Sequence, residues 1–195
     1  MDGAFGLWAR STPALRGLCA GAEAADSWAV DGHKWLQLPY DSGFAIVRHP
    51  EAHRRAMGMT ASYLNRGADD GRNPSDWVPE LSRRARGFAA WAVMQTLGRS
   101  GIREMVERHS ACARRLAQQL AGVPGIRVLN EVCLNQVALT FEHDMTDAVI
   151  AEIQRENAAF VSGADWRGRR ILRVSVISRD TGARDIDCLA QCIIR

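Results

Sequence analysis

The residue with the clearest capacity for chemistry is Lys34, the single lysine of a chain of 195 residues. It stands between His33 and Trp35, and arginine supplies all the other permanently charged basic side chains. A lysine amine becomes a nucleophile once desolvation or a neighbouring cation removes its proton, whereas a guanidinium keeps its charge in proteins. Lys34 is therefore the candidate for imine chemistry, and we expect it to form a Schiff base with an aldehyde cofactor.

Two short apolar segments surround this lysine. Residues 28–30 and 43–47 favour strands and are separated by turn-forming residues, which predicts a β-turn-β unit. Lys34 then lies just past the end of a strand, where a side chain can face a cleft. The polar segment of residues 54–72 contains several glycines and no sustained period, which predicts a mobile loop of the kind that often covers a site.

His49 and His53 have the spacing of two zinc ligands on one helical face. Glutamate does not follow the first histidine, however, and Pro50 does. Proline is typical of the first turn of a helix, so we interpret this segment as a helix start and predict no metal site. The five cysteines are scattered and odd in number, which favours reduced thiols over a disulfide framework or a zinc site.

Periodic patterns are clearest in the second half of the chain. Residues 81–97 and 101–121 predict helices, and the second has an apolar face formed by Ile102, Met105, Val106, His109, Ala113, Leu116 and Leu120. Strands are expected at residues 126–129, 136–141 and 171–177, and helices at residues 146–157 and 183–194. Strands and helices mixed in this way indicate an α/β domain that begins near Ser100.

The first half contains too few strands to close a domain of its own. Asp2 resembles a residue at the end of a central strand, and only Met1 stands where that strand should be. A sheet that lacks its inner strands exposes an edge and leaves apolar faces unburied. We therefore expect the chain to be the C-terminal part of a larger fold.

Four separated segments carry a family resemblance. Residues 25–43 contain Asp-Gly-His-Lys-Trp, and residues 60–64, 77–87 and 166–175 follow. Together, in order and at about the family's spacing, they resemble the pyridoxal-phosphate-dependent amino acid decarboxylases, the group that contains the aromatic amino acid, glutamate and histidine decarboxylases. In that family His-Lys-Trp carries the cofactor.

The resemblance implies the type I aminotransferase-like α/β fold of pyridoxal-phosphate enzymes, here incomplete. Residues 1–100 would be the C-terminal part of the large cofactor-binding domain, with a catalytic loop at about residues 54–76. Residues 101–195 would be the small C-terminal domain. The family's active unit is a homodimer with sites at the subunit interface. Its phosphate-binding loop, and the ring that stacks on the cofactor, lie upstream of the region that this chain covers.

The cofactor residues follow from the same resemblance. Lys34 matches the lysine that forms the Schiff base with pyridoxal 5'-phosphate. Asp2 matches the aspartate that keeps the pyridine nitrogen protonated, which makes the ring an electron sink; a turn aspartate is the alternative. His33 and Asp31 flank the lysine where the family places side chains near the cofactor phosphate, and a hydrogen bond to the turn is the alternative for each.

Two further residues match positions that act on the substrate. Tyr63 aligns with the loop tyrosine that reaches into the neighbouring subunit's site and returns a proton to Cα after carbon dioxide leaves, and a surface tyrosine is the alternative. A tyrosine there favours decarboxylation over the oxidative outcome associated with phenylalanine. Arg173, which strand alternation places opposite Leu172 and Val174, resembles the small-domain arginine that meets a carboxylate, and a structural salt bridge is the alternative.

Three functions are consistent with these residues. The leading hypothesis is a carboxy-lyase that acts on an amino acid and releases CO2. The second is a truncated chain, catalytically silent alone, that pairs with a full-length relative or with a chain carrying the missing N-terminal half, because half a cofactor site lacks the phosphate contacts. The third is a pyridoxal-phosphate transaminase, which shares the lysine and the aspartate but gives Tyr63 no evident role.

Composition argues against several other classes. The net charge of +3 is spread over arginines interleaved with acids, which speaks against a nucleic-acid partner. The sequence has no apolar run of about eighteen residues and no leader-like N-terminus, so we expect no membrane partner. Together with the unpaired cysteines, this predicts a cytoplasmic protein.

Overall fold

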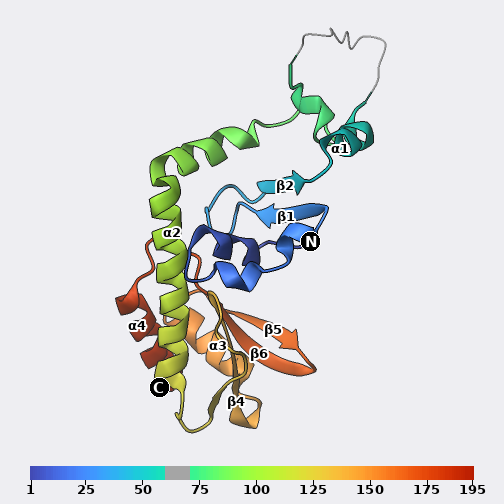
Figure 1. Ribbon diagram of the computed structural model, residues 1–195. Coiled ribbons are helices and arrows are strands. Elements are labelled where there is room, and N and C mark those ends of the chain that lie inside the picture. The colour runs from blue at the N-terminus through green and yellow to red at the C-terminus, as the bar shows by residue number, and fades with distance from the viewer. Residues whose placement is uncertain (60–70) are drawn as a thin grey trace.

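The computed structural model describes residues 1–59 and 71–195 as two sheets connected by a long bent helix (Figure 1). The strands are β1 (Ser27–Asp31), β2 (Gly43–Val47), β3 (Ile126–Val128), β4 (Gln136–Phe141), β5 (Ser162–Trp166) and β6 (Arg169–Ser175). The α-helices are α1 (Pro50–Met57), α2 (Arg86–Leu120), α3 (Thr146–Arg155) and α4 (Ala183–Ile194). Short 3₁₀ helices occur at Gly6–Ser11, Arg16–Cys19, Ala22–Ala24, Pro74–Asp76 and Glu142–Asp144. Within the described residues, no helix has both the length and the apolar character that crossing a bilayer requires.

Strands β1 and β2 form an antiparallel pair in the first half of the chain. Asp31 lies opposite Gly43, so the segment that contains Lys34 connects the adjoining ends of the two strands. The main chain of residues 1–3 runs parallel to β1 and hydrogen-bonds both backbone groups of Ala29, at 3.0 and 2.8 Å. The predicted β-turn-β unit is therefore confirmed.

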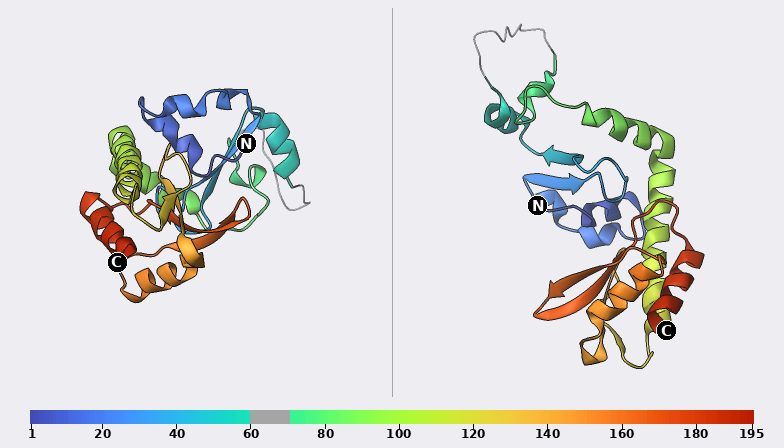
Figure 2. Two further views of the ribbon diagram at one scale, coloured as in Figure 1. Left: turned by 90° about the horizontal axis from the view of Figure 1, so that it is seen from below. Right: turned by 180° about the vertical axis from the view of Figure 1, so that it is seen from behind.

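The second sheet is antiparallel, with the strand order β3-β4-β6-β5. Helices α3 and α4 pack against it and against each other, as Figure 2 shows, and the C-terminal half of α2 completes the same core. Burial alternates along β6, where Leu172 and Val174 lie in the core and Arg173 is exposed. This pattern confirms the predicted α/β character of the second half.

Strand β5 is the element that the sequence patterns do not predict. It pairs with β6 through a hairpin whose two turn residues, Arg167 and Gly168, have φ angles of 51° and 72°. Positive φ at both positions is typical of the type I′ turn, which matches the twist of paired strands. The strand was missed because Gly163 and Asp165 are residues that strands disfavour, so the segment has no apolar alternation.

Helix α2 consists of two helical segments that meet at a kink, which confirms the two helices expected at residues 81–97 and 101–121. It begins only at Arg86, and it bends at Gly98, where φ is 60° and ψ is −174°. Figure 1 shows the N-terminal segment of α2 turning away from the second sheet at this bend. The bend lies near the boundary expected at Ser100, while the division into two domains stays a prediction.

Helix α1 starts at Pro50, as the proline predicts. Because this helix continues to Met57, residues 54–57 are helical, and the expected loop starts later than the glycine pattern suggested. Residues 60–70, which include Tyr63, lie outside the described part of the chain.

Candidate functional site

The Lys34 turn is fixed in place by the residues that follow it. Trp35, Leu36 and Leu38 have 0%, 4% and 5% exposure and pack in one core with α2. Gly32 precedes the lysine at a position without room for a side chain, because a Cβ there would lie 3.2 Å from the Ser42 carbonyl oxygen and closer still to side-chain carbons. The buried anchor on one side and the tight glycine on the other leave the lysine side chain as the part that faces outward.

The Lys34 amine lies between a carboxylate and an aromatic ring. Its Nζ is 2.5 Å from Asp31 Oδ2 and 4.5 Å from the centroid of the Phe5 ring. His33 Nε2 is 3.9 Å from the same carboxylate oxygen, and its ring stacks on Tyr40 with centroids 4.8 Å apart. Asp31 therefore contacts the lysine amine directly. The family resemblance placed Asp31 only near the cofactor phosphate.

A cavity of about 670 Å³ connects this turn with the second sheet. Its lining includes Lys34 and His33 on one side and Ser162, Arg173 and Ser175 on the other. Arg173 Nη2 donates to Ser162 Oγ at 3.5 Å. The structure thus brings together a lysine, a histidine and an arginine that the sequence singled out from segments far apart in the chain.

Asp2 lies elsewhere in the structure. Its carboxylate accepts a hydrogen bond from the Ala4 amide at 2.9 Å and lines a separate hollow of about 490 Å³ together with Gly6 and Cys19. It is not among the residues that line the Lys34 cavity. Its pairing with a cofactor nitrogen stays a prediction.

The cavity fits the aldehyde end of pyridoxal phosphate better than the phosphate end. A partly buried lysine amine is suited to a carbonyl carbon, and an arginine that lines the same cavity is suited to a carboxylate. The N-terminus of α4 also borders the cavity, but the Gly182 amide there already donates to Asp185 Oδ2 at 2.8 Å. Because a second anion would be repelled by Asp185, this helix end offers no ready phosphate cradle among the described residues.

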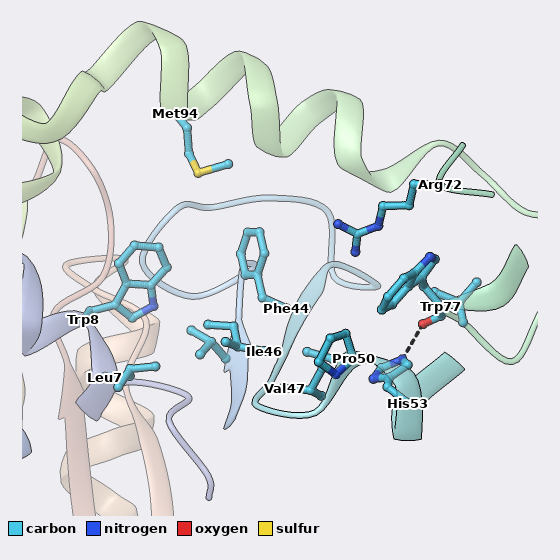
Figure 3. A pocket seen from close by; sticks show the side chains of 14 residues that line it. Leu7, Trp8, Phe44, Ile46, Val47, Pro50, His53, Arg72, Trp77 and Met94 are labelled. Carbon is cyan, nitrogen blue, oxygen red and sulfur yellow. Dashed lines mark hydrogen bonds between the residues drawn. The ribbon is translucent and has the colours of Figure 1, made fainter. Parts of the chain in front are cut away.

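A larger hollow, of about 750 Å³, lies between β2, α1 and the N-terminal segment of α2 (Figure 3). Figure 3 shows Trp8, Phe44 and Met94 facing one another across it. On its polar side His53 Nε2 lies 2.8 Å from the Trp77 carbonyl oxygen. The lining of this hollow comes from several separate segments, so sequence patterns do not predict it, and none of the described residues that line it carries a group suited to imine chemistry.

Two residues near the lysine were not recognised from sequence as parts of the site. Phe5 belongs to the short motif that begins at Asp2, and neither its residue type nor its spacing indicates a contact with the lysine. His109 was expected only as one member of an apolar helical face, yet it is fully buried and stacks on Trp35 with ring centroids 5.4 Å apart. A histidine among apolar residues on one helical face was the signal that could have identified it.

Comparison with known proteins gives a consistent result. A sequence model described as the pyridoxal-dependent decarboxylase conserved domain matches residues 1–142. A tyrosine decarboxylase of Oryza sativa subsp. japonica is 33% identical over 126 residues, which cover 63% of this chain and 24% of that protein. A 3,4-dihydroxyphenylacetaldehyde synthase of Aedes aegypti is 25% identical over 191 residues, which cover 96% of this chain and 37% of that protein.

The fold comparison extends over the whole chain. The crystal structure of Oryza sativa TDC with PLP and tryptamine superposes with a TM-score of 0.87 at 22% identity, over 98% of this chain and 42% of that one. The chain thus spans less than half the length of these relatives and has the fold of part of a larger enzyme. Pyridoxal phosphate is the cofactor of the family that matches. The resemblance seen in the four sequence segments is confirmed, and the chain belongs to the pyridoxal-dependent decarboxylase family.

Proposed function

We propose that this chain is the lysine-bearing part of a pyridoxal-phosphate-dependent amino acid decarboxylase, a carboxy-lyase that releases CO2. The observation that carries the proposal is the shared cavity, whose lining includes both the single lysine and Arg173. One group is suited to bind the cofactor's aldehyde carbon and the other to bind a substrate carboxylate.

Lys34 is the residue that would hold the cofactor covalently. Its amine must lose a proton before it attacks a carbonyl carbon. The Asp31 carboxylate, whose Oδ2 lies 2.5 Å from Nζ, holds the lysine head group in place through an ion pair, and the Phe5 ring limits the positions that the side chain can adopt. This geometry supports a role for Asp31 at the amine, in addition to its predicted position near the phosphate with His33.

When bound, pyridoxal phosphate supplies an electron sink for the electron pair left at Cα after a bond to that carbon breaks. Asp2 is the proposed partner of the ring nitrogen, and its exposed side chain leaves the carboxylate accessible. Arg173 would hold the substrate carboxylate from the second-sheet side of the cavity, where the Ser162 hydroxyl lies beside it. Tyr63 is the proposed donor of the proton that returns to Cα, which favours decarboxylation over aldehyde formation.

A second candidate is a chain that is silent alone and acts as the partner of another chain. The observation in its favour is the lining of the cavity, which supplies an amine and a guanidinium but no cradle of backbone amides for a phosphate. Association as a homodimer, or with a chain that carries the rest of the fold, would supply those contacts. The transaminase alternative gains no support from the relatives described above. The unpaired cysteines support a reducing compartment such as the cytoplasm.

Release of CO2 tests both candidates. The purified chain, alone and mixed with a chain that carries the N-terminal half of a related decarboxylase, is given pyridoxal phosphate and a panel of aromatic and acidic amino acids. We expect CO2 release that the Lys34→Arg variant abolishes, since arginine keeps the charge but cannot form the covalent link. Release only in the mixture identifies the second candidate. CO2 release that persists in Lys34→Arg, or transfer of the amino group to a keto acid instead, contradicts the proposal.

A further inference from the structure

The ring of His109 packs against the ring of Trp35, the residue that follows Lys34. It is carried by α2 and has 0% exposure, as does Trp35. The two rings stack with centroids 5.4 Å apart and an interplanar angle of 16°. Trp35 follows Lys34 directly in the chain, so the packing of its ring bears on the main chain from which the lysine side chain projects.

Three segments meet at His109. The first is α2 itself and the second is the lysine turn. The third is residues 178–181, which follow β6: the Arg179 amide donates to Gln37 Oε1 at 2.8 Å, and Arg108 Nε donates to the Thr181 carbonyl at 3.3 Å. The histidine therefore occupies the junction between the turn that carries the amine and the segment that continues the arginine-bearing wall of the cavity.

The buried His109 ring is uncharged at neutral pH. Burial, and to a lesser extent the positive charge of Arg108, lower its pKa to about 4, against the opposing effect of the backbone at Ser178 and Arg179. The backbone of Ser178 and Arg179 approaches the His109 ring closely enough to hydrogen-bond it, whereas Trp35 Nε1 is buried without a hydrogen-bond partner among the described residues. A buried polar group without a hydrogen bond destabilises a fold, and the Trp35 indole keeps its position through its stack on His109.

We infer that His109 is a positioning residue that acts on Lys34 through Trp35. The inference rests on the proposed role of Lys34 as the residue that binds the cofactor. With the indole held flat against α2, the main chain of the turn cannot rotate, and the amine stays beside Asp31 at the mouth of the cavity. A misplacement of about 1 Å can cost on the order of a hundredfold in a reaction that depends on orientation.

The test reads the position of the amine without any cofactor. Reductive methylation with ¹³C-formaldehyde labels the single lysine and the α-amino group, and Lys34→Arg assigns the lysine signal in a carbon NMR spectrum. The wild-type signal should be displaced from its position in the urea-unfolded chain. His109→Leu should move it toward the unfolded position, whereas His109→Phe, which keeps a flat ring, should leave it close to the wild-type position.

Leu116→Ala is the matched control, because Leu116 is equally buried on the same helix but packs only in the core of the second sheet. It should destabilise the chain and leave the lysine signal unchanged. If His109→Leu does not fold, His109→Met replaces it, since methionine fits irregular space without forming a stack. A lysine signal that stays in place in a folded His109→Leu or His109→Met chain overturns the inference, and so does an equal shift in Leu116→Ala.

The same chains separate this inference from the proposed function. With pyridoxal phosphate added and borohydride as the trapping reagent, we expect modification of Lys34 to slow about tenfold in His109→Leu and to recover in His109→Phe. Absence of Lys34 modification in the wild-type chain contradicts the proposed function, and the carbon signal of the methylated lysine still decides the role of His109.

Discussion

At the Lys34 amine, two neighbours of different character attract the same ammonium group. The Asp31 carboxylate lies 2.5 Å from Nζ, and the Phe5 ring face lies 4.5 Å away, within the range of a cation–π contact. Both contacts hold the side chain at the mouth of the cavity that Arg173 also lines. The amine is therefore oriented before any cofactor binds, which is what a covalent attachment point requires.

Arg173 offers the first test at this scale. Replacement by alanine removes the guanidinium fork from the cavity wall, so the affinity of the assembled enzyme for an amino acid substrate analogue should fall by about tenfold. Isothermal titration calorimetry measures this change. Arg170→Ala is the control, because Arg170 lies on the same strand but pairs with Asp147 at 2.8 Å. Equal affinities for wild type and Arg173→Ala would remove Arg173 from the substrate site.

His109 predicts a pH dependence of stability. Its folded pKa, about 4, lies below the ordinary histidine value of 6.5 because burial disfavours the charged ring. The unfolded chain therefore takes up this proton first, and the free energy of unfolding should decrease as the pH falls from about 6.5 to about 4, by a total of about 3 kcal/mol. Above that window the contribution of the neutral ring to stability is fully present.

Urea denaturation at several pH values checks this prediction. His109→Phe keeps the ring stack but cannot titrate, so its stability should change much less across the same window. Carboxylates such as Asp187, whose pKa Arg115 lowers, lose their stabilising effect only at more acidic pH in both chains. Parallel stability curves between about pH 6.5 and pH 4 would contradict the buried neutral state of His109.

At the residue scale, a rare residue type or a clear strand pattern is enough to identify a candidate site residue from the sequence. Lys34 is the single lysine, and Arg173 lies on a strand whose alternation exposes it, so both could be identified before their meeting in one cavity was visible. The contact between Asp31 and the amine depends on the shape of the turn, which the sequence does not specify. His109 was recognised as buried, but its stacking partner Trp35 comes from a distant segment.

At the scale of elements, the connection between β1 and β2 determines where the amine points. Gly32→Ala should lower the free energy of unfolding by about 1–3 kcal/mol, because the added Cβ would meet Ser42 and Leu38 in a packed site. Gly43→Ala is the control, since its Cβ would lie 3.5 Å from the Val30 carbonyl, an ordinary contact. Chemical denaturation measures both. Equal stability of the two variants would mean that the turn is looser than the structure shows.

The bend in α2 provides a second test of an element. At Gly98 the backbone adopts angles that other residues avoid, so Gly98→Ala should lower the free energy of unfolding by about 1–3 kcal/mol even though no atom lies within 4 Å of the new Cβ. Gly87→Ala, in the first turn of the same helix, should instead raise it by about 0.5–1 kcal/mol. A stabilising effect of Gly98→Ala would show that α2 is straight in solution.

Elements with strong periodicity were predicted correctly, and those set by tertiary contacts were not. Helix α4 was expected at residues 183–194 and lies at Ala183–Ile194, because its apolar face is continuous. Strand β5 was missed because pairing with β6, rather than its own composition, makes it a strand. The two helices expected at residues 81–97 and 101–121 are the two segments of α2, and the glycine at their junction predicted the break, although the first segment begins only at Arg86.

At the scale of the whole molecule, α2 connects two separate hydrophobic cores. Met105 and Val106 pack with the Lys34 turn, and Leu116 and Leu120 pack with the second sheet. The opposite end of α2 exposes Phe88 and Trp91, with 72% and 57% exposure. Exposed apolar surface of this kind is typical of faces that another chain covers, which supports the proposed association with a further copy or with the remainder of the fold.

Reductive trapping measures the proposed role of Lys34 most directly. The chain is incubated with pyridoxal phosphate and borohydride, once folded and once unfolded in urea. Peptide mass spectrometry then compares the modification of Lys34 with that of the α-amino group, which is the other primary amine of the chain. We predict that folding strongly favours Lys34 over the α-amino group. An equal ratio in the folded and unfolded chain, or a preference for the α-amino group on folding, would contradict the assignment of Lys34 as the cofactor-binding residue.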